Sequence, residues 1–256
     1  MMKTWFNHGA VAGHFIETKE RFISNTIRGL DYLNKYNFLP FDLKKTQEFI
    51  YSDVPEFEKF KNSKILVVAG GPTCNTSSWD AEDYDYIFSC NHFFLNDKVK
   101  RTKVDLCIIC DEVDILGEEF LTYVKKNKTF VGFEDYNKST LTVQKLTEHI
   151  PNRVFCGVSR MQGKIGVGPK LVILALILGA NQVDFVGVDG APKDYKQGEV
   201  SAHAFQNNKI FVCNYPYELI IDHYKVFKDY ILNDIGRDAI VNNLGDGHEY
   251  NCFSKI

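Results

Sequence analysis

The sequence lacks an apolar run long enough to cross a membrane, because the longest run, Leu171–Leu178, is far shorter than the about 20 residues that a spanning helix needs. The first residues, MMKTWFNHGAVAGHF, lack the continuous apolar segment of a secretory signal peptide. The sequence also lacks a large excess of acidic or basic residues, because the net charge is only −3. Such a charge gives no general attraction to nucleic acid or anionic lipid. We therefore expect a soluble, reduced, cytoplasmic protein without integral membrane contact.

The seven cysteines lack the spacing of a disulfide framework, and their number is odd. Cys107-x-x-Cys110 has neither a second CxxC nor a downstream histidine pair at zinc-finger spacing. Cys90, Cys107, Cys110 and Cys156 fall in or beside apolar runs, where a reduced cysteine packs as a small apolar residue. The pattern favours buried thiols over metal ligands, so we expect no metal site.

Apolar runs alternate with helix-like segments from Lys64 onward, which predicts a doubly wound, mostly parallel, Rossmann-like α/β sheet. We expect residues 1–62 to form an N-terminal helical extension that packs on the main domain or on a partner subunit of a homo-oligomer. Residues 63–256 would be the catalytic domain. The expected strands are Ile65–Ala69, Tyr86–Cys90, Val104–Cys110, Thr129–Gly132, Arg153–Cys156, Val183–Val188 and Ala239–Asn242. The expected helices are Glu118–Lys126, Ser139–His149, Pro169–Leu178 and Tyr217–Leu232.

The segment from 191 to 216 is polar and lies between an expected strand and an expected helix. A loop of this length in a compact domain is usually a lid or a disordered segment. Its position after the strand that ends near Asp189 favours a lid over a ligand.

Two glycine-rich turns are candidate segments for binding a nucleotide-like ligand. The first expected strand ends in Gly70, Gly71, Pro72 and Thr73, where backbone without side chains could offer N–H groups to a phosphate or ribose. This motif is neither GxGxxG nor a Walker motif, and it could instead be a tight strand-to-helix turn. The second turn, from Gly163 through Lys164, Gly166, Val167 and Gly168, leads into an apolar helix whose N–H groups suit a phosphate or carboxylate, or it is a flexible loop.

Polar residues follow several of the expected strands. Asn91 and His92 follow the second strand, where both are candidates to bind a nucleotide-like ligand and His92 is also a candidate base. Asp189 and Gly190 follow the strand VDFVGV. Asp189 could accept hydrogen bonds from ribose hydroxyls or cap the next turn. Asp111, Glu112 and Asp114 could face the same crevice or form a solvated acidic loop. His203 lies on the expected lid, and His223 lies on a helix where a partly buried histidine is common.

The order of these motifs resembles the bacterial metal-independent sialyltransferases over about residues 64–190. Gly70-Gly71-Pro72-Thr73 is similar to that family's G-x-GPS turn, although it is one residue shorter, and Ser89-Cys90-Asn91 with a following aromatic is similar to its Arg-Cys-Asn motif. The matching positions farther on are Lys164, Gly168, Gly179, Gly187 and Asp189. The resemblance implies a single Rossmann-type domain, a lid, and a nucleotide-sugar as co-substrate without a required cofactor.

The chain departs from that family at three places. Val167 stands where the family has a serine that helps to hold the sialic-acid carboxylate, and Asp111 stands for an asparagine. The family's catalytic histidine has no counterpart near Cys213-Asn214. An acid at 111 would suit proton removal from an acceptor hydroxyl, so Asp111 is the first candidate base, with His203 second and His223 a further candidate.

The predicted function is a glycosyltransferase that moves a sugar from CMP-sialic acid or a UDP-sugar to a hydroxyl on a glycan or a modified nucleobase. One alternative is a magnesium-dependent diphosphotransferase of the pterin-pyrophosphokinase type, with Asp111, Glu112 and Asp114 as metal ligands. Another is a nucleotide-binding module without catalysis.

Overall fold

The computed structural model describes residues 55–110, 113–133, 140–156, 166–190 and 236–245, and shorter stretches at 194, 196, 198–200, 202–207, 209, 224–225, 227–228 and 231–232. The predicted N-terminal extension therefore lies outside the described residues, apart from 55–62. In the described part of the chain, no helix is long and apolar enough to cross a membrane.

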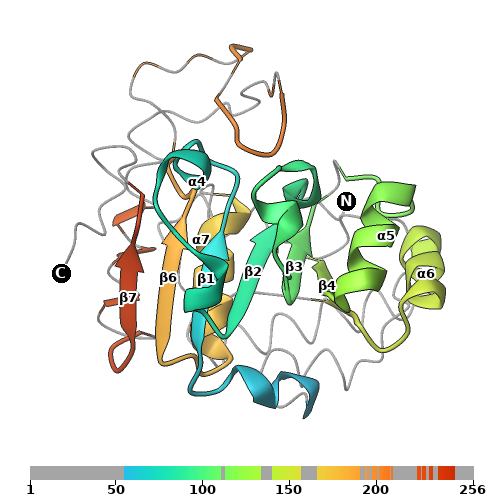
Figure 1. The fold of residues 1–256 in the computed structure, drawn as a ribbon, viewed down its shortest axis with the longest axis horizontal. Helices are drawn as coiled ribbons and strands as arrows, with labels where there is room; N and C mark the ends of the chain where they lie inside the picture. Colours follow the sequence, from blue (N-terminus) through green and yellow to red (C-terminus); the bar gives the residue numbers. More distant parts are fainter. Residues whose placement is uncertain are drawn as a thin grey trace, which may run out of the picture.

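The described strands form one sheet of seven, in the order β5-β4-β3-β2-β1-β6-β7, and every neighbouring pair is parallel (Figure 1). The mostly parallel sheet predicted from the sequence is thus parallel throughout its described strands. The strands are β1 (Lys64–Val68), β2 (Tyr86–Cys90), β3 (Leu106–Ile109), β4 (Phe130–Phe133), β5 (Val154–Cys156), β6 (Gln182–Val186) and β7 (Ile240–Asn243).

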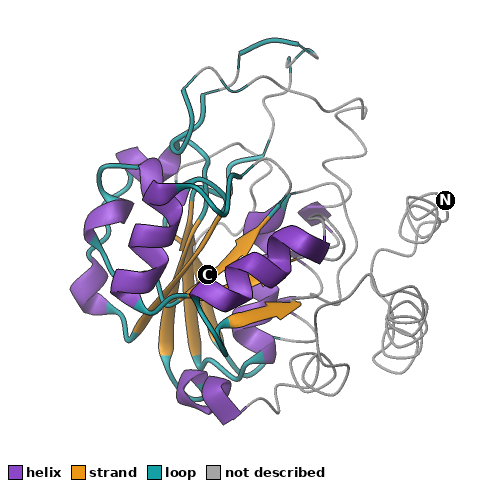
Figure 2. Ribbon diagram, turned by 90° about the vertical axis from the view of Figure 1, so that its right-hand side faces the viewer, coloured by secondary structure: helices purple, strands orange, loops and turns teal. Residues whose placement is uncertain are grey.

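Helices cover both faces of the sheet, as the edge-on view in Figure 2 shows. The α-helices are α4 (Thr73–Thr76), α5 (Glu118–Asn127), α6 (Thr140–His149) and α7 (Val167–Ile177). The 3-10 helices are η1 (Pro55–Phe60), η2 (Ala81–Asp83), η3 (Phe93–Leu95) and η4 (Val99–Arg101). Because both faces are covered, the central strands are buried along almost their whole length and read as continuous apolar runs.

Helix α7 packs on β1, β2 and β6 and is apolar on nearly every side. The sequence predicted that Pro169 is the first residue of this helix. The helix begins at Val167, so Pro169 is its third residue. A proline is tolerated there because the first four N–H groups of a helix have no partner within the helix.

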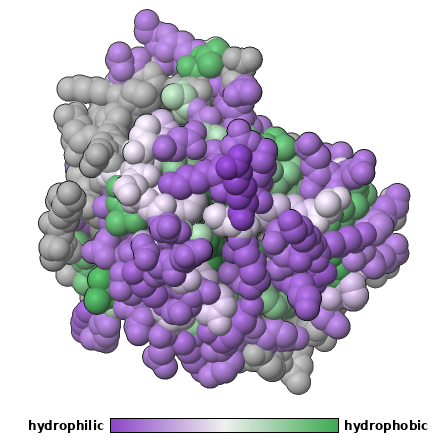
Figure 3. Space-filling model, viewed as in Figure 1, coloured by the Kyte–Doolittle hydropathy of each residue, from purple (hydrophilic) through white to green (hydrophobic). Residues whose placement is uncertain are grey.

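Residues 55–60 pack into the core. The Phe57 ring lies 4.7 Å from the Phe155 ring and the Phe60 ring lies 4.9 Å from the Phe88 ring, centroid to centroid. Both side chains are almost fully buried. The face of the molecule in Figure 3 is mainly hydrophilic, with apolar residues in small scattered groups.

Candidate active site

The order of the strands reverses between β1 and β6. Strands β2 to β5 follow one another on one side of β1, whereas β6 and β7 lie on its other side. In an open parallel sheet, ligands bind outside the carboxyl ends of the strands at such a switch point. Gly70 and Gly71 follow β1 here, and the segment from Gly187 to Gly190 follows β6.

Thr73 and Asp189 join the two sides of this switch point. The backbone amide of Thr73 donates to the Asp189 carboxylate over 2.8 Å, and the Thr73 hydroxyl donates to its other oxygen. The same hydroxyl accepts a hydrogen bond of 2.9 Å from the Gly187 amide. Asp189 is 8% exposed, and its carboxylate caps the start of α4, which lies 116 positions upstream, and not the turn that follows Asp189 in the chain. Its contact with a ligand stays a prediction.

Gly71 and Gly187 allow the segments after β1 and β6 to lie close together. A Cβ atom on Gly71 would lie 2.4 Å from an Asp189 carboxylate oxygen, and one on Gly187 would lie 2.1 Å from the Ala69 carbonyl oxygen. Gly187 also has a φ of +74°, which disfavours other residues.

Two amides of the first glycine turn already have partners within the protein. The Gly71 amide donates to the Gly187 carbonyl over 2.8 Å, and the Thr73 amide donates to Asp189 over 2.8 Å. Pro72 has no N–H. The expectation of bare N–H groups is therefore wrong for Gly71 and Thr73, and a phosphate at this edge would need further donors.

The N-terminus of α7 supplies such donors at the same place. A Cβ atom on Gly168 would lie 2.8 Å from the Ala69 Cβ and 3.1 Å from a Val188 methyl, so the first turn of α7 fits between the ends of β1 and β6. Gly166, the residue before the helix, is exposed, has a φ of +79° and has open space where a side chain would be. No side chain among the described residues caps this helix start.

Asn91 connects the ends of β2 and β3. Its side-chain oxygen accepts hydrogen bonds from the Cys110 amide over 2.9 Å and from the Cys110 thiol over 2.8 Å. Its backbone is left-handed, with a φ of +52°, a conformation that asparagine tolerates better than most residues. Asn91 is half-buried at the carboxyl edge of the sheet, as predicted, but its side-chain oxygen is already engaged in the hydrogen bonds with Cys110.

Residues 203–206 of the predicted lid lie against the carboxyl ends of β1 and β2. The Ala204 amide donates to the Gly70 carbonyl over 2.8 Å, and the Ala204 carbonyl accepts from the Asn96 side chain over 2.8 Å. The His203 ring covers Gly70, where an added Cβ would lie 2.3 Å from the ring carbon Cε1. The ring nitrogen Nδ1 of His203 accepts the Phe205 N–H over 3.2 Å.

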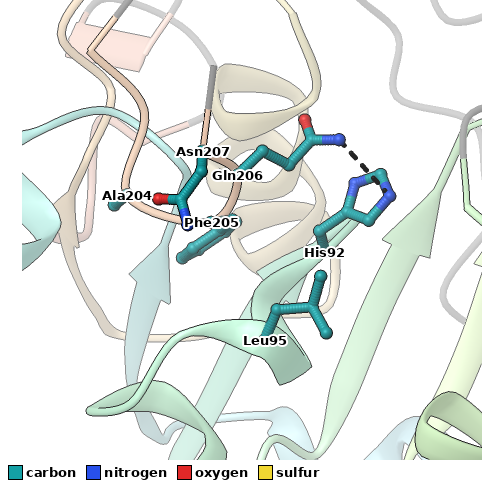
Figure 4. Close-up of a pocket in the computed structure, with 6 residues that line it drawn as sticks. All are labelled: His92, Leu95, Ala204, Phe205, Gln206 and Asn207. Carbon is teal, nitrogen blue, oxygen red and sulfur yellow. Dashed lines mark hydrogen bonds between the residues drawn. The ribbon is translucent and has the colours of Figure 1, made fainter. Parts of the chain in front are cut away.

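A cavity of about 370 Å³ lies between this segment and the end of β2. Figure 4 shows the His92 and Gln206 side chains facing each other, joined by a contact of 3.4 Å between His92 Nε2 and the Gln206 amide nitrogen. The residues that line the cavity are His92, Leu95, Ala204, Phe205, Gln206 and Asn207.

Burial raises the pKa of several groups beneath the crevice. It raises the pKa of the Cys74 thiol to about 12, and it raises the pKa of the Cys90 thiol further. Burial, with a smaller contribution from the Asp189 charge, also raises the pKa of Tyr224, whose ring lies 3.3 Å from where a Cβ of Gly190 would be. These groups are therefore neutral at physiological pH. Cys90 and Cys107 are buried free thiols, as predicted, and Cys110 is half-buried.

Three of the predicted site residues, Asp111, His223 and Lys164, lie outside the described residues. So does Glu112, whereas the exposed Asp114 accepts a hydrogen bond from the Leu116 amide. In the described ranges, no group of three histidine, cysteine, aspartate or glutamate side chains could hold a metal ion. The other predicted residues gather along the carboxyl ends of β1, β2 and β6 and at the start of α7, namely Gly70, Gly71, Pro72, Thr73, Asn91, His92, Gly166, Val167, Gly168, Asp189, Gly190 and His203.

Sequence reasoning missed Asn96 and Gln206. Asn96 is 6% exposed and bonds to Ala204, to Asn75, and through its oxygen to the Lys98 and Val99 amides. No local pattern marks either residue as part of the site, because the contacts that bring them there, Asn96 to Ala204 and Gln206 to His92, each span more than 100 positions.

Comparisons with known proteins give a fold but no family. No family model and no curated protein matches the chain. Among solved structures, a single-residue variant of the sialyltransferase CST-II in complex with CMP is 14% identical, with a TM-score of 0.50 over 71% of this chain and 81% of that chain.

Two further structures, both from Campylobacter jejuni, are similar. The sialyltransferase CstII with cytidine-5′-monophosphate is 14% identical over 72% of this chain and 81% of its own, with a TM-score of 0.48. The monofunctional alpha-2,3-sialyltransferase Cst-I is 14% identical over 73% of this chain and 77% of its own, with a TM-score of 0.47. The likeness to the CST-II variant, at a TM-score of 0.50 and 14% identity, shows a shared fold alone.

Proposed function

We propose that this protein is a glycosyltransferase that moves a sugar from a nucleotide-sugar, CMP-sialic acid or a UDP-sugar, to a hydroxyl on a glycan or a modified nucleobase. The observation that carries the proposal is the position of α7. Its N-terminus, which no side chain of the described residues caps, lies at the switch point of the parallel sheet, between the ends of β1 and β6.

The start of α7 has the chemistry of a phosphate site. The unpaired N–H groups of the first helical turn and the helix dipole both favour an anion there. Gly166 and Gly168 bring backbone without side chains to this point, and Gly190 is exposed after β6. In this proposal the donor phosphate lies at residues 166–168, Lys164 adds a positive charge, and the rest of the nucleotide lies along the glycine turn toward Asp189 and Gly190.

The solved structures support a donor of this class. One similar structure is that of a sialyltransferase in complex with CMP, and another is that of a sialyltransferase with a trisaccharide acceptor and CMP. Those ligands belong to those proteins. Their relevance to this chain rests on the shared fold.

The reaction would be a displacement at the anomeric carbon of the donor. The acceptor hydroxyl oxygen bonds to that carbon, the bond from the carbon to the phosphate oxygen breaks, and a base takes the hydroxyl proton. Residues 202–207 lie above the strand ends, where they would exclude water that otherwise hydrolyses the donor. We propose that transfer requires no metal ion.

The test is a thermal-shift screen of the full chain against CMP, UDP, GDP, ATP and their nucleotide-sugars, with and without EDTA. A ligand that binds only the folded state raises the melting temperature. Selective stabilisation by one nucleotide-sugar, followed by release of its nucleotide in the presence of EDTA, supports the proposal.

Two results would overturn it. Stabilisation by ATP that depends on magnesium would favour a diphosphotransferase. Binding of a nucleotide without release of product from any nucleotide-sugar, even with glycan acceptors added, would favour a binding module.

A further inference from the structure

The cavity beside β2 has a lining suited to an uncharged polyol. Of its six described lining residues, none carries a carboxylate, an ammonium or a guanidinium group. Gln206, Asn207 and His92 offer hydrogen-bonding groups. Leu95, 44% exposed, and Phe205 offer an apolar wall. The volume of about 370 Å³ falls within the about 300–1,000 Å³ of small-molecule sites, at the end suited to a single sugar ring.

The Gln206 side chain, which lines this cavity, has a buried acceptor. Its side-chain oxygen is buried and has no hydrogen-bond partner among the described residues. A buried acceptor without a partner is costly, and a ligand hydroxyl would supply the missing donor. Its amide nitrogen, in contrast, lies 3.4 Å from His92 Nε2.

That contact fits one tautomer of His92. With the Gln206 amide nitrogen as the donor, His92 Nε2 accepts with its lone pair, and the proton of the neutral ring is then on Nδ1. At 3.4 Å the contact is long for a hydrogen bond, so a sugar hydroxyl could replace it without losing a strong interaction. An imidazole nitrogen with its lone pair directed into a site is the usual form of a general base near neutral pH.

We propose that this cavity binds an uncharged acceptor sugar and that His92 is the base that takes the proton from its reacting hydroxyl. The inference rests on the proposed glycosyltransferase function and specifies its acceptor site. The hydroxyl proton moves to His92 Nε2 as the hydroxyl oxygen bonds to the anomeric carbon. The nucleotide leaves with the electron pair of the bond that breaks. Leu95 and Phe205 contact the apolar face of the sugar ring, and Gln206 accepts a second hydroxyl.

The surroundings of His92 suit this role. Among the described residues that line the cavity, His92 is the only titratable side chain. The described ionisable groups close to His92 along the chain include Cys90, Asp97 and Lys98, and the facing segment carries His203 and Lys209. Burial raises the pKa of Cys90, so this thiol is neutral at physiological pH. The half-buried His92 ring is stacked beside the Phe94 ring, with 6.3 Å between the ring centroids.

The experiment uses the full chain and measures release of nucleotide from CMP-N-acetylneuraminic acid, UDP-glucose and UDP-galactose, with water and then with labelled lactose as acceptor. His92→Ala should lower the rate by about 100-fold or more, the usual contribution of a positioned base. Donor affinity, measured by calorimetry, should change less than about threefold. Free imidazole should restore part of the activity of His92→Ala and should not affect the wild type.

Two further variants complete the test. His92→Gln keeps a side chain that hydrogen-bonds but cannot take a proton at neutral pH, so it should bind the donor normally and be as slow as His92→Ala. His149→Ala removes an exposed histidine at the end of α6, outside the cavity, and should leave the rate unchanged.

The outcomes separate the two proposals. If the wild type neither binds nor cleaves any of the three donors, the proposed function fails and this inference fails with it. If the wild type releases nucleotide and His92→Ala does so equally fast, without any response to imidazole, His92 is not the base and the glycosyltransferase proposal stands. A His92→Gln variant with wild-type rates would also overturn the inference.

Discussion

The carboxylate of Asp189 accepts two hydrogen bonds from Thr73, one from the backbone amide over 2.8 Å and one from the side-chain hydroxyl, although 116 positions separate the residues. These bonds connect the turn after β1 to the end of β6, the two sides of the switch point. The Thr73 hydroxyl also accepts the Gly187 amide, so one side chain satisfies groups from both segments.

Replacing Thr73 by valine should therefore destabilise the protein. The shape is kept, but the Gly187 amide and the Asp189 carboxylate lose a partner in a buried site, which costs about 1–3 kcal/mol. Urea unfolding followed by circular dichroism measures the loss. Thr76→Val, on an exposed residue of the same short helix, is the control and should stay within about 0.5 kcal/mol of wild type. Equal stability of the two variants would contradict the importance of this connection.

Asn91→Ala should weaken the fold as well as any ligand contact. The substitution leaves the Cys110 amide without an acceptor and places alanine at a φ of +52°. Asn152, exposed and left-handed at a φ of +61°, provides the control, because Asn152→Ala carries only the backbone cost. We expect Asn91→Ala to lower the unfolding free energy by about 1–3 kcal/mol more than Asn152→Ala. A nucleotide affinity measured for Asn91→Ala has to be read against this loss.

Gly70→Ala should detach residues 203–206 from the strand ends. An added Cβ would lie within 2.6 Å of two atoms of the His203 ring, so the ring has to move and the bond between the Ala204 amide and the Gly70 carbonyl should weaken. Hydrogen exchange of residues 202–207 should speed up. It should slow again in Gly70→Ala/His203→Ala, which removes the clash. Gly132→Ala, whose new Cβ would meet only ordinary contacts of 3.5 Å, should leave this exchange unchanged.

Val167→Asp should separate helix stability from donor binding. A carboxylate at the first residue of α7 interacts favourably with the helix dipole, by about 0.3–1 kcal/mol. The same charge repels a phosphate a few ångströms away by roughly 1–4 kcal/mol, so nucleotide affinity should fall at least about fivefold. Calorimetry measures the affinity, and Val167→Asn is the neutral control. An unchanged affinity in Val167→Asp would remove the phosphate from this helix start.

Stability should fall in alkaline solution through the buried thiols. A thiol ionises near 9.0 in water, whereas burial raises the pKa of Cys74 to about 12 in the folded protein. The folded state therefore keeps a proton that the unfolded chain has lost. This contribution is complete below about pH 9 and decreases by up to about 1.4 kcal/mol per pH unit as the pH rises toward 12. Unfolding free energies between pH 7 and 11 should fall less steeply for Cys74→Ala. If the unfolding free energies of the wild type and of Cys74→Ala fall equally steeply with pH, the raised pKa of Cys74 is contradicted.

The strands were predictable because the local pattern is complete. Tyr86–Cys90 is a continuous apolar run with turn residues on both sides, and the structure has β2 within the same bounds. Burial on both faces of a parallel sheet produces such runs, so the signal does not depend on distant residues. The predicted start of α7, Pro169, lies two residues after the observed start, Val167. Proline is compatible with any of the first positions of a helix, so it does not mark one of them.

The contacts of the site could not be predicted in the same way. The sequence placed Asp189 and Gly70 at strand ends, but which groups they bond depends on the pairing of β1 with β6 and on where residue 204 returns. The sequence indicated free amides at Gly70–Thr73, and the structure shows that segments more than 100 positions away use two of them. The contact between Gln206 and His92 could not be predicted either, because it also joins segments more than 100 positions apart.

The order of the strands also has a consequence for synthesis of the chain. Strands β1 to β5 pair with neighbours that leave the ribosome soon after them, but the other edge of β1 waits for β6, whose first residue is Gln182. At about 5–20 residues per second, this interval lasts on the order of ten seconds. During that time a flat, apolar edge made of Ile65, Leu66 and Val67 has no partner, and such edges pair readily with other chains. The growing polypeptide is thus most exposed to aggregation at its central strand, at a stage when its first five strands can already have formed.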